Sequence, residues 1–386
     1  MAKQPLKALL PPLIFGTATF TSQYNKDPYA LDTTGLVRAA LDHGIRAFDT
    51  SPYYGPAETL LGEGLAAART EYPRNSYLLL TKVGRIAGDS FDYSAASVKA
   101  SVKRSCERLH TDFLDVVYCH DVEFVSGAEV LEAIRALREL RNEGVIKFVG
   151  VSGYPVERLC EMAELVLKET GEPLDIVMSY ANYTVQSERL ASVGLERLKK
   201  AGVQVVPNAS VLGMGLLRAG GAPVGSQGDW HPAPEGLRAV VAKAAEFCED
   251  HGEKLEVVAI RWGIESWLKV GGEVGSYGRP GEDHTRGSAT TLEGQESRLG
   301  VSVIGVSRHD ELEKTMLVWH SILDGLEGGQ AHADRAGRWE RAHEWSLNRR
   351  HAVEMLAEEV RAILKEWADY AWASPPKGFV NTLNQK

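Results

Sequence analysis

The chain has 386 residues, of which 44% are hydrophobic and 25% charged, and its formal net charge at pH 7 is −9. This composition is typical of a globular protein that can build its core without disulfides or metals. The acidic balance argues against a nucleic-acid partner, which would need a basic face.

Short apolar runs alternate along the chain with longer segments whose apolar residues recur at helical spacing. The apolar runs predict strands at Leu13–Thr17, Ile45–Asp49, Tyr77–Lys82, Leu114–Tyr118, Val145–Val151, Ile176–Ser179, Val203–Pro207 and Val301–Ile304. The longer segments predict helices at Thr33–His43, Pro56–Ala68, Ala95–Leu109, Glu129–Asn142, Val156–Leu167, Leu190–Lys200, Leu237–Glu249, Leu255–Ser266 and Glu311–Leu323.

Strands interleaved with helices imply a parallel sheet, and strands that are apolar throughout imply that both faces are covered. About eight strand–helix units predict an α/β fold, a single-domain (β/α)8 TIM barrel. The alternative is a doubly wound open sheet, which usually carries a glycine-rich turn directly after its first strand. Here that strand is followed by Gly16, Thr17, Ala18 and Thr19, which do not form that pattern, so the barrel is favoured.

Two segments fall outside the repeat. Residues 269–300 are rich in Gly, Ser, Thr and charge, which predicts a long surface insertion before the last strand. Residues 326–386 predict a C-terminal extension that packs on the barrel and contains an amphipathic helix at about Ala352–Tyr370. The barrel itself is assigned to residues 11–325.

The four cysteines are widely spaced and form no CxxC pair, which predicts free thiols in a reducing compartment and no metal site. The N-terminal apolar run is interrupted by Pro11 and Pro12, unlike a secretion signal. No stretch approaches the roughly 18 apolar residues of a membrane span. We therefore expect a cytoplasmic protein that does not cross a membrane.

Four polar residues fall where consecutive predicted strands end. Asp49 and Lys82 close the second and third strands, Tyr54 lies five residues after Asp49, and His120 follows the fourth strand. Taken singly, each has an ordinary structural interpretation as a helix cap, a loop anchor, a solvated strand end or a satisfied buried histidine. In a parallel barrel, however, all strand C-termini meet at one face, so the four side chains are expected to converge there.

This group is chemically coherent. An ammonium near Tyr54 is expected to lower the pKa of the phenol toward neutrality, so that it can give and take a proton. Asp49 would hold Lys82 charged and in place, and His120 would orient a carbonyl or hydroxyl oxygen. The set predicts carbonyl–alcohol interconversion with a hydride carried by a nicotinamide cofactor.

Several segments resemble the aldo-keto reductase family: FDTSPYYGPAETLLGEGL (Phe48–Leu65), LTKVG (Leu80–Gly84), LDVVYCHD (Leu114–Asp121), IKFVGVSGY (Ile146–Tyr154) and VIGVSRHDEL (Val303–Leu312). The resemblance covers about residues 11 to 325. It implies a (β/α)8 barrel that binds NAD or NADP without a Rossmann domain. It also implies that Asp49, Tyr54, Lys82 and His120 are the catalytic tetrad.

The resemblance further implies a set of cofactor-binding positions. These are Gly16, Thr17, Ser152, Gly153, Ser179, Ser210, Leu212, Gly213, Gly215, Gly305, Ser307 and Arg308. Three positions depart from the family pattern, since Gly153 stands where an asparagine is usual, Ser179 stands where a glutamine is usual, and Ala209 or Ser210 replaces a stacking tyrosine. Glu311 or Leu312 stands where a basic residue is usual after Arg308, which favours NAD over NADP.

The substrate pocket is expected among the loops on the same face, with Tyr24, Tyr53, Phe124 and Trp230 as candidate lining residues. The segments MSYANYTVQ and ASVLGMGLL resemble the subgroup that includes L-galactose and D-arabinose dehydrogenases, which implies oxidation of an aldose to a lactone. Two alternatives remain open: an NADPH-dependent aldehyde or ketone reductase, and a cofactor-binding regulatory subunit. The expected partner is a small carbonyl compound or sugar, and the oligomeric state stays open.

Overall fold

The computed structural model describes residues 4–221, 229–277, 298–326 and 338–385. Within these residues eight parallel strands close into a barrel in chain order, with β8 pairing back to β1. The strands are β1 (Leu13–Gly16), β2 (Ala47–Asp49), β3 (Leu78–Val83), β4 (Leu114–His120), β5 (Ile146–Gly153), β6 (Ile176–Tyr180), β7 (Asn208–Ala209) and β8 (Ser302–Gly305). The predicted (β/α)8 barrel is confirmed.

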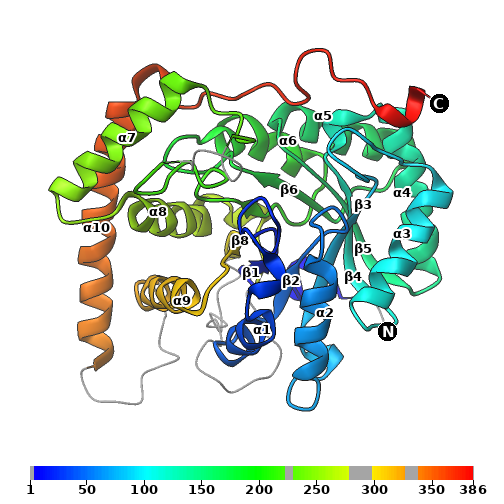
Figure 1. Cartoon of the computed structure of the whole chain (residues 1–386), viewed down its shortest axis with the longest axis horizontal. Coiled ribbons are helices and arrows are strands. Elements are labelled where there is room, and N and C mark those ends of the chain that lie inside the picture. Colours follow the sequence, from blue (N-terminus) through cyan, green and yellow to red (C-terminus); the bar gives the residue numbers. More distant parts are fainter. Residues whose placement is uncertain (1–3, 222–228, 278–297, 327–337, 386) are drawn as a thin grey trace.

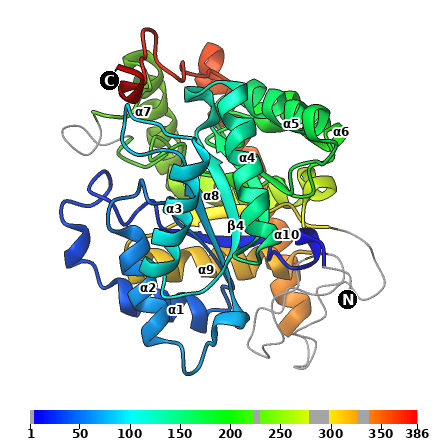
Figure 2. The same cartoon turned by 90° about the vertical axis from the view of Figure 1, so that its right-hand side faces the viewer.

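Helices surround the barrel, and Figure 1 shows them outside the strands. They are α1 (Thr33–Asp42), α2 (Ala57–Ala67), α3 (Ala95–Arg108), α4 (Gly127–Asn142), α5 (Val156–Thr170), α6 (Leu195–Lys200), α7 (Glu235–Asp250), α8 (Leu255–Val270), α9 (His309–Asp324) and α10 (Arg338–Leu364). Figure 2 shows α3, α4 and α5 as neighbours on one side of the molecule.

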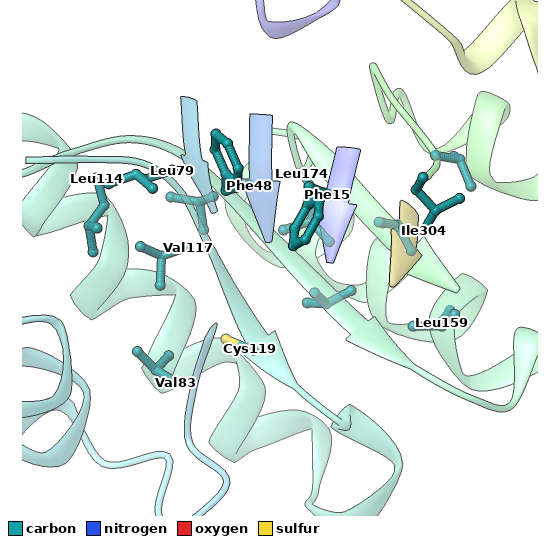
Figure 3. Close-up of a cluster of buried hydrophobic side chains, with 14 of the residues drawn as sticks. Phe15, Phe48, Leu79, Val83, Leu114, Val117, Cys119, Leu159, Leu174 and Ile304 are labelled. Carbon is teal, nitrogen blue, oxygen red and sulfur yellow. The ribbon is translucent and has the colours of Figure 1, made fainter. Parts of the chain in front are cut away.

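Side chains on the strands alternate between two hydrophobic layers. Phe15, Phe48 and Leu79 point outward into the layer between strands and helices, part of which is shown in Figure 3. Ile14 and Leu80, one position away on the same strands, belong instead to the interior of the barrel. Burying one side chain of this size stabilises the fold by about 1.5–3 kcal/mol, so both layers hold the barrel closed.

The same alternation positions the polar residues at the strand ends. Asp49, Lys82 and His120 each stand two residues after a side chain of the barrel interior, on β2, β3 and β4 respectively. Because side chains repeat direction every second residue in a strand, all three point inward at the C-terminal end of the barrel. At the other end, before β1, the fully buried Leu6 and Leu10 pack against the interior layer.

The seventh strand differs from its prediction. Val203–Pro207 was expected, but the ladder that joins both neighbouring strands is confined to Asn208 and Ala209. Pro207 has no N–H to donate, so it cannot extend the ladder backwards. Val205 still forms an isolated parallel bridge with Ile176, so the preceding residues are extended without forming a full strand.

The C-terminal helix also differs from its prediction. Instead of about Ala352–Tyr370, α10 spans Arg338–Leu364, beyond which the chain turns back across the molecule. Its apolar face, including Val353 and Val360, packs on α7 and α8. A partly buried ion pair reinforces this packing, because Arg350 of α10 donates to Glu265 of α8 at 2.5 Å.

The predicted insertion is described only at its ends. Its start overlaps the last residues of α8, and an antiparallel bridge between Ser276 and Leu299 joins the two ends. Residues 278–297 lie outside the described residues. No helix of the described residues has the length and apolar character needed to cross a membrane.

Candidate active site

A cavity of about 620 Å³ opens at the C-terminal ends of the strands. Asp49, Tyr54, Lys82 and His120 all line it, as expected from their positions at three consecutive strand ends. Tyr54 reaches it from the loop between β2 and α2. The sequence-based expectation that these four side chains converge is therefore met by the geometry.

Lys82 is the centre of this group. Its Nζ donates to Asp49 Oδ1 at 2.6 Å and to the carbonyl oxygen of Thr50 at 2.9 Å. The same ammonium lies 4.8 Å from the ring centroid of Tyr54. Lys82 and Asp49 are both almost completely buried, so their mutual attraction is little screened by solvent. The pair fixes a positive charge next to the Tyr54 ring.

The pKa of the Tyr54 phenol departs from its sequence-based expectation. Burial raises this pKa well above its ordinary value, and the negative charges of Asp49 and Asp121 raise it further, whereas Arg85 acts in the opposite direction. The expected lowering toward neutrality was wrong for this arrangement, because desolvation outweighs the nearby cations. Tyr54 is thus a protonated phenol at neutral pH, which is the form that donates a proton.

His120 is held in a defined state. Burial lowers its pKa well below the ordinary value, and the charges of Lys82 and Arg85 lower it further, so the ring is neutral at pH 7. The Ser51 hydroxyl lies 3.1 Å from Nδ1, and this oxygen already accepts the N–H of Tyr53 at 3.1 Å. Donation by Ser51 to Nδ1 leaves the proton on Nε2, where it can be offered to an oxygen in the cavity.

All four predicted substrate-contacting residues line the cavity, namely Tyr24, Tyr53, Phe124 and Trp230. The rings of Tyr24 and Trp230 meet edge to face at 5.5 Å, and the Tyr53 ring lies edge-on to His120 at 5.8 Å. Aromatic walls of this kind suit the C–H faces of a small organic substrate.

The predicted cofactor positions divide into two sets. Eight of them line the cavity: Gly16, Ser152, Ser210, Leu212, Gly215, Gly305, Ser307 and Arg308. The other four are not among its lining residues: Thr17, Gly153, Ser179 and Gly213.

Strand alternation explains three of these four exceptions. Thr17, Gly153 and Ser179 each follow or precede an inward position by one residue. The side chains of Thr17 and Ser179, and a Cβ if one were added at Gly153, therefore face away from the interior. Thr17 Oγ1 donates to the carbonyl oxygen of Asp49 at 3.1 Å, and Ser179 Oγ accepts from Asn182 at 2.9 Å. Both hydroxyls have structural partners instead of a ligand.

Gly153 has a specific steric explanation. A Cβ at this position would come within 2.5 Å of Oε2 of Glu123. The carboxyl of Glu123 therefore occupies the space that an asparagine side chain would need, and burial raises the pKa of this carboxyl to about 8. Its Oε1 accepts from the backbone N–H of Tyr154 at 3.1 Å and from the Ser374 hydroxyl at 3.0 Å.

The remaining polar groups on the wall fit a dinucleotide. Ser152 Oγ is buried without a hydrogen-bond partner among the described residues, as expected of a group that awaits a ligand amide. The turn after β7 adopts positive φ at Ser210, Gly213 and Gly215, and it is held by its own hydrogen bonds, among them Gly213 N–H to the Ser210 carbonyl oxygen at 2.8 Å. It places Ser210, Leu212 and Gly215 on the cavity wall. Ser307 and Arg308 continue this wall after β8.

Sequence reasoning missed several lining residues. Arg85 directly follows the LTKVG motif and Asp121 is the last residue of LDVVYCHD, so their charge at a strand end was an available signal. Trp372 and Ser374 of the C-terminal segment carried no such signal, because they lie more than 200 residues from their partners Tyr154 and Glu123 in the chain. Among the described residues, no group of His, Cys, Asp or Glu side chains could hold a metal ion.

A closed parallel barrel with a polar cavity at its strand C-termini defines the class of (β/α)8-barrel enzymes. The sequence profile of the aldo/keto reductase family matches residues 12–325. The chain belongs to this family of oxidoreductases.

Two characterised members of this family are similar in sequence to the chain. D-arabinose 1-dehydrogenase of Saccharomyces cerevisiae is 42% identical over 266 residues, which cover 68% of this chain and 78% of that protein. L-galactose dehydrogenase of Arabidopsis thaliana is 38% identical, over 60% of this chain and 70% of that protein. Among solved structures, glycerol dehydrogenase of Gluconobacter oxydans covers 94% of both chains with a TM-score of 0.56 and 18% identity, which supports the fold alone.

Proposed function

We propose that this protein is an NAD(P)-dependent aldose 1-dehydrogenase, which oxidises the anomeric carbon of a sugar to a lactone. The observation that carries the proposal is the convergence of Asp49, Tyr54, Lys82 and His120 on one cavity. The substrate class follows the relatives, whose names specify D-arabinose and L-galactose as the sugars they oxidise.

In this reaction the C1 hydroxyl loses its proton and the C1–H bond breaks with its electron pair, so that a cyclic aldose becomes a lactone. The bound nicotinamide supplies the acceptor for the hydride, or its donor in reverse. Tyr54 exchanges the proton with the reacting oxygen, and its high pKa makes it a ready acid in the reductive direction. In the oxidative direction the same oxygen, as phenolate, takes the proton of the C1 hydroxyl, and the ammonium of Lys82 beside the ring stabilises that phenolate.

The other three residues prepare this exchange. Lys82 is fixed by Asp49 and stabilises negative charge on the phenol oxygen, and His120 offers its Nε2 proton to the reacting oxygen. For the cofactor, we propose that Ser152 binds the carboxamide and that the turn from Ser210 to Gly215 binds the pyrophosphate.

The residues after β8, which we assign to the adenosine end of the cofactor, support a preference for NAD. Glu311, which lines the cavity, accepts the N–H of Ser307 at 2.8 Å and pairs with Arg308 at 3.0 Å. Asp310 also pairs with Arg308, at 2.9 Å, so the charge of this guanidinium is already neutralised. A carboxylate in this place accepts a hydrogen bond from a ribose hydroxyl and repels a 2′-phosphate.

The test is a spectrophotometric screen at 340 nm. The purified protein is given NAD or NADP with a panel of aldoses that includes D-arabinose and L-galactose, and NADPH with a panel of aldehydes and ketones. Reduction of NAD by an aldose, with the lactone identified as product, supports the proposal. Turnover of NADPH with aldehydes alone would replace it by a reductase, and no turnover together with a stable protein partner would indicate a regulatory subunit.

Replacing Glu311 by Gln tests the cofactor preference. This change removes the negative charge with little change in volume, so kcat/KM with NADP should rise roughly tenfold while that with NAD changes less. Steady-state kinetics with both cofactors measure this ratio. Glu313→Gln on the same helix is the matched control, since Glu313 is not among the residues that line the cavity. An unchanged ratio in Glu311→Gln would show that Glu311 does not discriminate.

A further inference from the structure

Beside the tetrad, two charged residues form a second unit in the cavity wall. Arg85, from the loop after β3, pairs through Nη1 with Oδ2 of Asp121, which directly follows β4. Arg85 Nη2 also donates to the Tyr53 hydroxyl at 3.0 Å, and its guanidinium lies 3.8 Å from the centroid of the Tyr53 ring. Stacking and pairing from both sides hold the guanidinium in one orientation.

Both the burial and the backbone conformation of Asp121 are energetically unfavourable. It is almost fully buried, and its backbone adopts φ 58°, a left-handed conformation that strains an L-residue. Its Oδ1 is buried and has no hydrogen-bond partner among the described residues, although Asp121 lines the cavity. A buried carboxylate oxygen without a donor is unfavourable by itself, so its presence in a cavity wall points to a donor that a ligand supplies.

The pair of Arg85 and Asp121 lies next to the place where the sugar would react. Asp121 Oδ2 lies 3.5 Å from Nε2 of His120, the atom that offers its proton to the reacting oxygen. In a sugar, the hydroxyl on the neighbouring carbon lies about one hydrogen-bond length from the oxygen on C1. Such a hydroxyl both donates and accepts, which matches a carboxylate and a guanidinium placed side by side.

We propose that Arg85 and Asp121 form a hydroxyl-recognition pair that selects aldoses carrying a free hydroxyl at C2. The C2 hydroxyl donates to Oδ1 of Asp121 and accepts from an N–H of Arg85. This inference rests on the proposed function and deepens it. Because Asp121 neutralises Arg85, the pair selects neutral sugars and gives no advantage to phosphorylated or carboxylated ones.

The experiment compares two sugars that differ by one hydroxyl. D-arabinose and 2-deoxy-D-ribose share every carbon and stereocentre except C2, where the second has no hydroxyl. We expect kcat/KM of the unmodified enzyme to be about 10- to 100-fold higher for D-arabinose. In Asp121→Asn, the ratio of kcat/KM for D-arabinose to kcat/KM for 2-deoxy-D-ribose should fall below about threefold, whatever change in turnover the two sugars share.

A second variant and a control guard against structural effects. Arg85→Lys keeps a positive charge beside Asp121 but loses the planar fork, and it should collapse the ratio between the two sugars in the same way. Glu164→Gln breaks the exposed pair between Arg197 and Glu164, far from the cavity, and should leave the ratio unchanged.

The outcomes separate the two proposals. Turnover of aldoses by the unmodified enzyme, with an unchanged ratio in both variants, overturns the hydroxyl-recognition pair alone. An equal fall of kcat/KM for both sugars does the same, because it indicates a purely structural role. Failure of the unmodified enzyme to oxidise any aldose overturns the proposed function and the pair with it.

Discussion

At the scale of single residues, the convergence of the proposed catalytic group could be predicted because three of its four members occupy strand ends of known parity, and Tyr54 follows one of them in a short loop. Asp49, Lys82 and His120 each fall two residues after an inward apolar side chain, a pattern visible in the sequence itself. The pKa of Tyr54 could not be predicted in this way, since it depends on burial and on Asp121, whose position is set by tertiary structure. Local spacing determines which side chains meet, whereas the surrounding packing determines their protonation.

Replacing Tyr54 by Phe should abolish most of the activity. The change removes only the hydroxyl that exchanges a proton, so kcat should fall by about 10²- to 10⁴-fold while the Kd of the cofactor stays within about twofold. Steady-state kinetics and a fluorescence titration with NAD measure the two quantities. A normal kcat in the Tyr54→Phe variant would contradict the role of the phenol.

Glu123 should make stability depend on pH. Burial and the charge of Asp121 raise the pKa of the Glu123 carboxyl from 4.5 to about 8 in the folded protein. The buried neutral carboxyl therefore contributes fully to the free energy of unfolding below pH 4.5, the unfolded-state pKa, and this contribution is lost as the pH rises toward 8. Linkage bounds the effect at about 4 to 5 kcal/mol. The neutral variant Glu123→Gln should therefore gain Tm relative to the unmodified protein as pH increases from 5 to 8.5.

Differential scanning calorimetry across this pH range measures the gain. Glu196→Gln, which changes a carboxylate exposed on α6, is the control and should show a Tm difference that does not vary with pH. A constant difference for Glu123→Gln as well would mean that Glu123 is ionised throughout the range.

At the scale of elements, most helices and strands lie where periodicity predicts them, and the exceptions have local causes. The strand expected at Val203–Pro207 is displaced because Pro207 cannot donate to a ladder. The last helix begins earlier and ends earlier than its apolar pattern indicated, since its boundaries depend on packing against α7 and α8. We propose that residues 326–386 are an extension integral to the barrel fold.

The segment after α10 crosses the mouth of the barrel along the upper edge of Figure 1. Trp372 stacks on Tyr154 with ring centroids 4.5 Å apart, and Ser374 donates to Glu123. Asn381 exchanges two hydrogen bonds with the backbone of Phe91, at 3.0 and 2.7 Å. This segment therefore completes one wall of the cavity.

A chain that ends at Asp369 should retain the barrel and bind the cofactor, because the segment removed includes none of the residues assigned to the nicotinamide or the pyrophosphate. Its KM for the sugar should rise at least about tenfold, since an aromatic wall is lost. Kinetics and circular dichroism measure both properties, with a chain ending at Leu383 as control. Equal KM values in the two shortened chains would show that the segment does not shape the sugar site.

At the scale of the whole molecule, the closed barrel could be predicted from the sequence. Eight successive strand–helix units can be connected into a parallel sheet in only a few topologies. The sequence could not predict contacts such as that between Asn381 and Phe91, which join distant parts of the chain. The thiols illustrate the global consequence of burial, since three of the four, Cys119, Cys160 and Cys248, lie inside the packed layers and Cys106 is half-buried.

The thiols should be unreactive in the native protein. Burial raises the pKa of Cys106, Cys160 and Cys248 to about 11 and raises that of Cys119 as well, so little thiolate exists at pH 7.5. Labelling with Ellman's reagent should be at least about 100-fold slower in buffer than in denaturant. Fast labelling of the folded protein would contradict this burial.

The crossing segment also bears on the order of events during synthesis. The barrel can close only after β8 has emerged, and the cavity gains its last wall when Asn381 reaches the loop at Phe91, 290 residues earlier in the chain. Contacts between such distant residues form late and slowly. The barrel can therefore close before the segment that carries Trp372 and Asn381 docks and completes the cavity wall.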